Sequence, residues 1–80
     1  MTKMDDAMKK ASEMGYYGPL LNALILKLEG EIAVAKANVE VYQKNAAGIG
    51  EHPDVVEAIE TQIAKIAEAQ DKIETIQRFF

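Results

Sequence analysis

Two long stretches with helical periodicity lie on either side of a single cluster of helix breakers, and this arrangement constrains the fold more than any other feature of the chain. The stretches cover residues 19–47 and 53–80, and the breakers that separate them include Gly48, Gly50 and Pro53. Each stretch carries an apolar seam at alternating spacings of four and three residues, which is typical of a helix packed against one partner helix. The turn, over residues 48–53, is short, so we expect an all-α antiparallel helical hairpin.

The seam residues set the expected pairing of the two helices. The first seam consists of Leu21, Ile25, Leu28, Ile32, Ala35, Val39, Tyr42 and Ala46. The second consists of Val56, Ile59, Ile63, Ile66, Gln70, Ile73, Gln77 and Phe80. Gln70 interrupts the second seam, and a buried polar side chain there can fix the register of the helices. Selection of register by Gln70 and a merely tolerated polar residue are equally good interpretations, whereas Gln77 is expected to be exposed near the chain end.

Residues 1–15 form a shorter amphipathic stretch that we expect to be a helix of its own. Asp5 and Asp6 suit its first turn, and Gly15 is placed to end it. Its apolar side consists of Met1, Met4, Met8, Ala11 and Met14. Methionine surfaces adapt to varied partners, so Met1, Met4, Met8 and Met14 are candidate contacts for another protein. Packing of this segment onto the chain's own helices is the competing interpretation, and a disordered segment is a third.

The first long helix carries a second apolar stripe opposite its seam. The stripe consists of Leu26, Gly30, Ala33, Val34, Ala37 and Val41. A helix that is apolar on two opposite faces is a middle layer, so something must cover the second face. Gly30 strengthens this argument, because glycine inside a helix costs about 1 kcal/mol relative to alanine and its lack of a side chain allows close approach of another backbone. We expect a second copy of the chain there, in a homodimeric four-helix bundle; the N-terminal segment is the alternative occupant.

Most of the aromatic side chains collect at the open end of the predicted hairpin. With their leucine neighbours they form the cluster Tyr16, Tyr17, Leu20, Leu24, Phe79 and Phe80. Packing of the helix ends explains such a cluster most simply. A site for a small apolar ligand is the alternative, and it leads to a different class of function.

Catalytic and metal-binding patterns are missing from the sequence. His52 is the single histidine, and in its loop only Glu51 could assist it, so we expect it merely to precede the second helix. The carboxylate pairs lack the Glu-x-x-His motif that di-metal bundles require. Gly48-Ile49-Gly50 follows a helix and lacks the Lys-Ser/Thr of a phosphate-binding loop. We therefore predict no enzyme, no cofactor and no metal.

Length and charge exclude further classes of function. The 80 residues suffice for one small domain, and the absence of cysteine fits a reducing compartment. The net charge is −4, and residues 51–80 hold seven acidic against three basic side chains, which repels nucleic acid. The longest apolar run, residues 20–26, is far shorter than the roughly 20 residues that span a bilayer. Asp5 and Asp6 disfavour anionic lipid surfaces, so we expect a cytoplasmic protein that does not bind membranes.

These observations predict a non-enzymatic protein that acts through helix–helix contacts, as a small assembly, adaptor or regulatory protein. Short helical proteins without motifs are common among phage and prokaryotic accessory proteins, so this class is a candidate on frequency alone, with no residue that indicates it. A bundle that binds a small apolar ligand at its open end is the alternative. Heptad seams occur in too many unrelated proteins to indicate a family.

Overall fold

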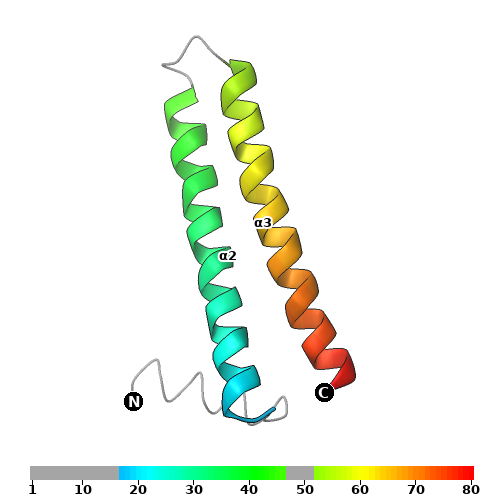
Figure 1. The fold of residues 1–80 in the computed structure, drawn as a ribbon. Coiled ribbons are helices and arrows are strands. Elements are labelled where there is room, and N and C mark those ends of the chain that lie inside the picture. The colour runs from blue at the N-terminus through cyan, green and yellow to red at the C-terminus, as the bar shows by residue number, and fades with distance from the viewer. Residues whose placement is uncertain (1–16, 47–51) are drawn as a thin grey trace, which may run out of the picture.

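Two antiparallel helices form the hairpin that the seams predict. The computed structural model describes residues 17–46 and 52–80, and contains α2 (Pro19–Ala46) and α3 (His52–Phe79), which pack against each other (Figure 1). Both helices lie within one residue of their predicted bounds, and α3 begins at His52. The helix predicted for residues 1–15 and most of the turn predicted for residues 48–53 lie outside the described residues.

The start of α2 follows from Gly18 and Pro19, at the point where the helix begins. Gly18 has a φ of +96°, a backbone conformation that only glycine adopts at little cost. Its carbonyl oxygen accepts a hydrogen bond from the backbone N–H of Asn22, at 3.0 Å. Pro19 then occupies the first helical position, where its fixed φ suits the helix and its missing N–H costs nothing. The predicted start of the first long helix is therefore confirmed.

The seam of α2 is confirmed along its described length. Leu28 and Ala35 are buried, with 2% and 1% of their surface exposed. The other seam residues whose side chains are described are half-buried: Leu21, Ile25, Ile32, Val39 and Tyr42. The spacing of apolar residues was enough to predict this seam, because only one set of heptad positions is apolar on the side of α2 that packs against α3.

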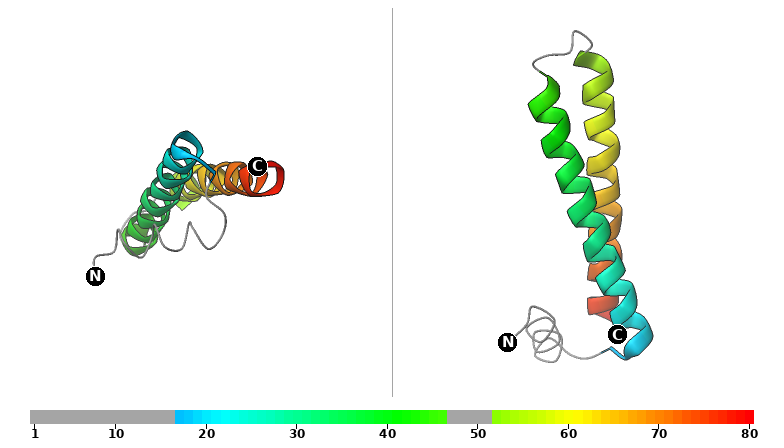
Figure 2. Two further views of the ribbon diagram at one scale, coloured as in Figure 1. Left: turned by 90° about the horizontal axis from the view of Figure 1, so that it is seen from below. Right: turned by 90° about the vertical axis from the view of Figure 1, so that its left-hand side faces the viewer.

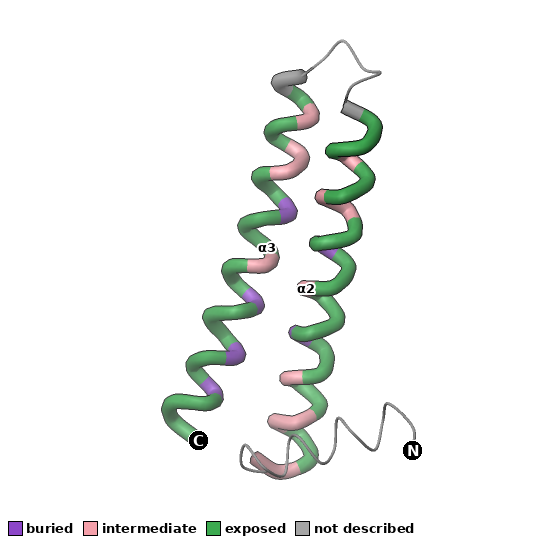
Figure 3. The backbone as a smooth tube through the Cα atoms, turned by 180° about the vertical axis from the view of Figure 1, so that it is seen from behind, coloured by how far each residue is buried: buried purple, intermediate pink, exposed green. Residues whose placement is uncertain are grey.

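The seam of α3 differs in part from the prediction. Val56, Ile63, Gln70, Gln77 and Phe80 are all exposed. The buried and half-buried positions are Val55, Ala58, Ile59, Gln62, Ile66, Ala69, Ile73 and Ile76. Five of the eight predicted seam residues are therefore exposed, Gln77 among them as expected, while Ile59, Ile66 and Ile73 are common to both frames. Figure 3 shows the buried positions of α3 on the side that faces α2.

The physical reason is whether the polar side chain that each frame buries has a hydrogen-bond partner. The predicted frame buries Gln70 and leaves Gln62 and Ile76 exposed. The observed frame buries only Gln62, whose amide oxygen accepts a hydrogen bond from Asn38 across the helix interface. A buried polar group that has a partner is tolerated, whereas an unpaired one costs about 1–3 kcal/mol. Exposing Ile63 is the smaller cost, and Gln70 instead bonds Glu74 on the surface of α3.

The core of the described hairpin is a single thin layer between two helices that cross at an angle (Figure 2). Leu28, Ala69, Ile73 and Ile76 form its centre, and Tyr17, Leu21, Ile25 and Ile32 pack around them. Several large apolar side chains of both helices remain outside this layer. Neither described helix is both long and apolar enough to cross a membrane.

Candidate functional site

The predicted second stripe of α2 is exposed to solvent along its length. We call these residues the outer stripe: Leu26, Gly30, Ala33, Val34, Ala37 and Val41. Its three large side chains are 60%, 62% and 52% exposed at Leu26, Val34 and Val41 respectively. Because α3 packs on the seam at the opposite side of α2, no described part of the hairpin covers this stripe. Contiguous apolar surface of this kind is typical of a contact site for another protein segment.

Gly30 lies at the middle of the outer stripe, and nothing in the described hairpin requires a glycine there. Its φ is not positive, since Gly18 is the described residue with that conformation. A Cβ atom added at Gly30 meets nothing within 4 Å. An alanine would therefore stabilise the isolated helix by about 1 kcal/mol. If the glycine has a structural role, that role involves something outside the described residues.

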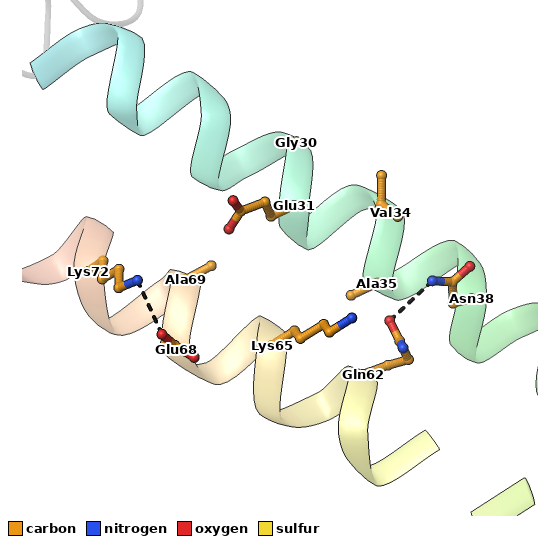
Figure 4. Close-up of a pocket in the computed structure, with 10 residues that line it drawn as sticks. All are labelled: Gly30, Glu31, Val34, Ala35, Asn38, Gln62, Lys65, Glu68, Ala69 and Lys72. Carbon is orange, nitrogen blue, oxygen red and sulfur yellow. Dashed lines mark hydrogen bonds and ion pairs between the residues drawn. The ribbon is translucent and has the colours of Figure 1, made fainter. Parts of the chain in front are cut away.

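A groove between the two helices adjoins one edge of the outer stripe. This first groove has a volume of about 720 Å³ and is lined by Gly30, Glu31, Val34, Ala35, Asn38, Gln62, Lys65, Glu68, Ala69 and Lys72. Figure 4 shows Ala35 and Ala69 pointing between the helices, whereas Val34 points away from α3. Gly30 and Val34 belong to both surfaces, so the first groove and the outer stripe form one continuous face.

The hydrogen bond between Asn38 and Gln62 lies at one end of the first groove. The Asn38 side-chain amide donates to the Gln62 amide oxygen at 3.1 Å (Figure 4). Gln62 is buried and Asn38 is half-buried, so the pair bridges α2 and α3 within the helix interface. Sequence reasoning assigned the register-setting role to Gln70 and missed this pair. The available signal was the position of Gln62, which shares a heptad frame with Ala69 and Ile76.

Charged side chains occupy the flank of α2 beside the first groove. Lys27 forms an ion pair with Glu31, and Lys72 of α3 pairs with Glu68 at 3.2 Å. The hydrogen bond from Lys27 lowers the pKa of Glu31, partial desolvation opposes this shift, and the charges of Lys27 and Lys72 lower the pKa further. Any stabilisation from this carboxylate is present above its ordinary pKa and is lost as the pH falls through the lowered value. Both side chains of the Lys27–Glu31 pair are largely exposed, so its contribution is small.

The described residues of the predicted aromatic cluster lie at the open end of the hairpin (Figure 1), where all but Tyr17 are exposed. Tyr17 packs against the core, Leu24 is borderline exposed, and Leu20, Phe79 and Phe80 are well exposed. Tyr16, like Met1, Met4, Met8 and Met14, lies outside the described residues. A second groove, of about 220 Å³, is lined by Lys36, Val39, Glu40, Ile63 and Ile66. Neither groove includes a residue of the open end, so binding of an apolar ligand there stays a prediction.

The side chains at this face can form hydrogen bonds, ion pairs and apolar contacts. Within residues 17–46 and 52–80, no group of three or more His, Cys, Asp or Glu side chains could hold a metal ion. No protein-family model matches this chain, and searches of curated proteins and of solved structures find no match either.

Proposed function

We propose that this chain is a helix–helix association protein that serves as a small assembly, adaptor or regulatory protein, and that its first partner is a second copy of itself. In this dimer the outer stripes of two α2 helices pack together and each α3 lies outside. The observation that carries the proposal is the exposure of Leu26, Val34 and Val41 around an otherwise unexplained Gly30.

The spacing of small residues favours a second copy over an unrelated helix. Ala23, Gly30 and Ala37 recur at intervals of seven residues, so they lie on one line along α2, and all three are exposed. In an antiparallel pair with its two-fold axis at Gly30, Ala23 of one copy faces Ala37 of the other. The pattern is therefore self-complementary, as a two-fold symmetric interface requires. Small residues at such positions allow the two helix axes to approach closely.

The size of the apolar stripe predicts an association that depends on protein concentration. Full burial of a Val or Leu side chain contributes roughly 1.5–3 kcal/mol. Leu26, Val34 and Val41 are about half-exposed, so two copies together gain on the order of 5–10 kcal/mol from them. Association costs about 4–15 kcal/mol. Close backbone packing around Gly30 must supply the remainder, which makes the dimer sensitive to bulk at that position.

Substitution of leucine along the stripe tests the dimer. The wild type should show a mass of twice 8.8 kDa by size-exclusion chromatography with light scattering. Gly30→Leu and Ala37→Leu should shift the protein toward the monomer and weaken dimerisation at least tenfold, because the added side chains separate the two α2 backbones. The measurement is the mass as a function of protein concentration, from about 1 μM to 1 mM.

Ala64→Leu is the matched control, since Ala64 is an exposed alanine on α3, away from the stripe. It should leave the dimerisation constant unchanged. Leucine has a higher helix propensity than glycine, so loss of the dimer in Gly30→Leu cannot result from an unfolded helix. A monomeric wild type over the whole concentration range, or equal effects of Ala37→Leu and Ala64→Leu, would contradict the proposal.

A further inference from the structure

We propose that the first groove binds the N-terminal segment of the same chain, residues 1–16, as a third helix antiparallel to α2. The groove is open along the side of the hairpin where Glu31 of α2 and Lys72 of α3 lie. Its floor contains small side chains, Ala35 and Ala69, which leave room for a helix bearing long side chains. This inference concerns an occupant within the chain and does not depend on the proposed dimer.

The point of attachment and the length of the segment decide which groove it can reach. The segment joins the hairpin at Tyr17, which packs against the core at the open end. As a helix, sixteen residues extend about 24 Å. Gly30, at the near end of the first groove, is eleven residues along α2 from Pro19, or about 16 Å away. The second groove begins at Lys36, about 26 Å away, so the near end of the first groove is the one well within the length of the segment.

The side of the hairpin that bears the first groove carries the ion pairs Lys27–Glu31 and Lys72–Glu68, with apolar residues nearer the open end. Leu24 precedes Glu31 by seven residues, so the two lie on the same flank of α2. Phe79 follows Lys72 by seven residues, so these two lie on the same flank of α3. A segment leaving Tyr17 therefore meets Leu24 and Phe79 before it reaches Gly30. Its methionine side, at helical spacing, suits Leu24, Phe79 and the small alanines of the groove floor, because methionine fills irregular gaps.

Covalent attachment favours this occupant over a separate molecule. A segment joined by a short link is present at an effective concentration on the order of millimolar. Because Gly30 and Val34 belong to both surfaces, a segment bound in the first groove partly covers the outer stripe. Binding of the segment and packing of another helix on that stripe should compete.

Disulfide trapping in the full-length protein tests this inference, because the chain has no cysteine. A helix that reverses direction at residues 15–18 places Met4 level with residue 29, about 3 Å along the helix axis from Glu31, which lies on the groove side. The pair Met4→Cys with Glu31→Cys should form a disulfide within one chain at least tenfold faster than Met4→Cys with Glu29→Cys. Glu29 is the matched control, since it is exposed, two residues away, and lines neither groove. Product mass on a non-reducing gel separates bonds within a chain from bonds between chains.

A second measurement avoids any need for a disulfide to form. The chain has no tryptophan, so Met8→Trp and Lys10→Trp report separately on the apolar and polar sides of the segment. Met8→Trp should emit at shorter wavelength and resist iodide quenching several-fold better than Lys10→Trp. Equal disulfide rates for the two cysteine pairs, equal quenching of the two tryptophans, or bonds mainly between chains would each overturn the proposal.

Discussion

Replacing Ile76 with alanine should lower the free energy of unfolding by about 2–3 kcal/mol, whereas replacing Ile63 should lower it by less than about 1 kcal/mol. Ile76 is 6% exposed within the core of the hairpin, and Ile63 is 51% exposed. Removal of buried methyl groups loses their transfer free energy and leaves a cavity, and neither cost applies fully at an exposed site. Urea unfolding followed by circular dichroism, at one fixed protein concentration, measures both values.

This pair of substitutions distinguishes the two heptad frames of α3 directly. Both replace isoleucine with alanine in the same helix, so helix propensity changes equally in the two variants. In the frame predicted from the spacing, Ile63 is a seam residue and Ile76 is not. A larger destabilisation for Ile63→Ala than for Ile76→Ala would therefore restore the predicted frame.

Replacing Asn38 and Gln62 together by leucine should raise the free energy of unfolding by about 1–3 kcal/mol while reducing the uniqueness of the fold. The two side chains form the hydrogen bond that crosses the helix interface. An apolar pair of similar size removes the desolvation cost of two amides. It also removes the one described hydrogen bond that crosses this interface, and with it a contact that requires a fixed direction. The expected observations are a higher urea midpoint together with extra or broadened backbone amide signals by NMR.

Gln70→Leu is the control for this double variant, because Gln70 is exposed and bonds Glu74 within its own helix. It should change stability by no more than about 0.5 kcal/mol. The single variant Gln62→Leu should fall below the double variant, since Asn38 then loses its partner in a half-buried position. A double variant with one sharp set of amide signals would show that packing alone sets the register.

The sequence by itself determined the helical hairpin and the seam of α2. Periodicity, Pro19 and the breakers around Gly48 agree with one another, and each acts through local backbone geometry, which does not depend on tertiary structure. The exposed outer stripe was also predictable, because residues from Leu26 to Val41 divide between two opposite faces of one helix. These features follow from spacing along the chain alone.

Only the tertiary structure decided the frame of α3. Its sequence allows two seams that share Ile59, Ile66 and Ile73 and differ by one residue elsewhere. Side-chain hydrophobicity favoured Ile63 over Gln62, and that choice was wrong. The deciding contact is with Asn38, twenty-four residues away in sequence, which gives a buried Gln62 a hydrogen-bond partner. Whether a polar side chain can be buried depends on what faces it across the interface, and no pattern within α3 contains that information.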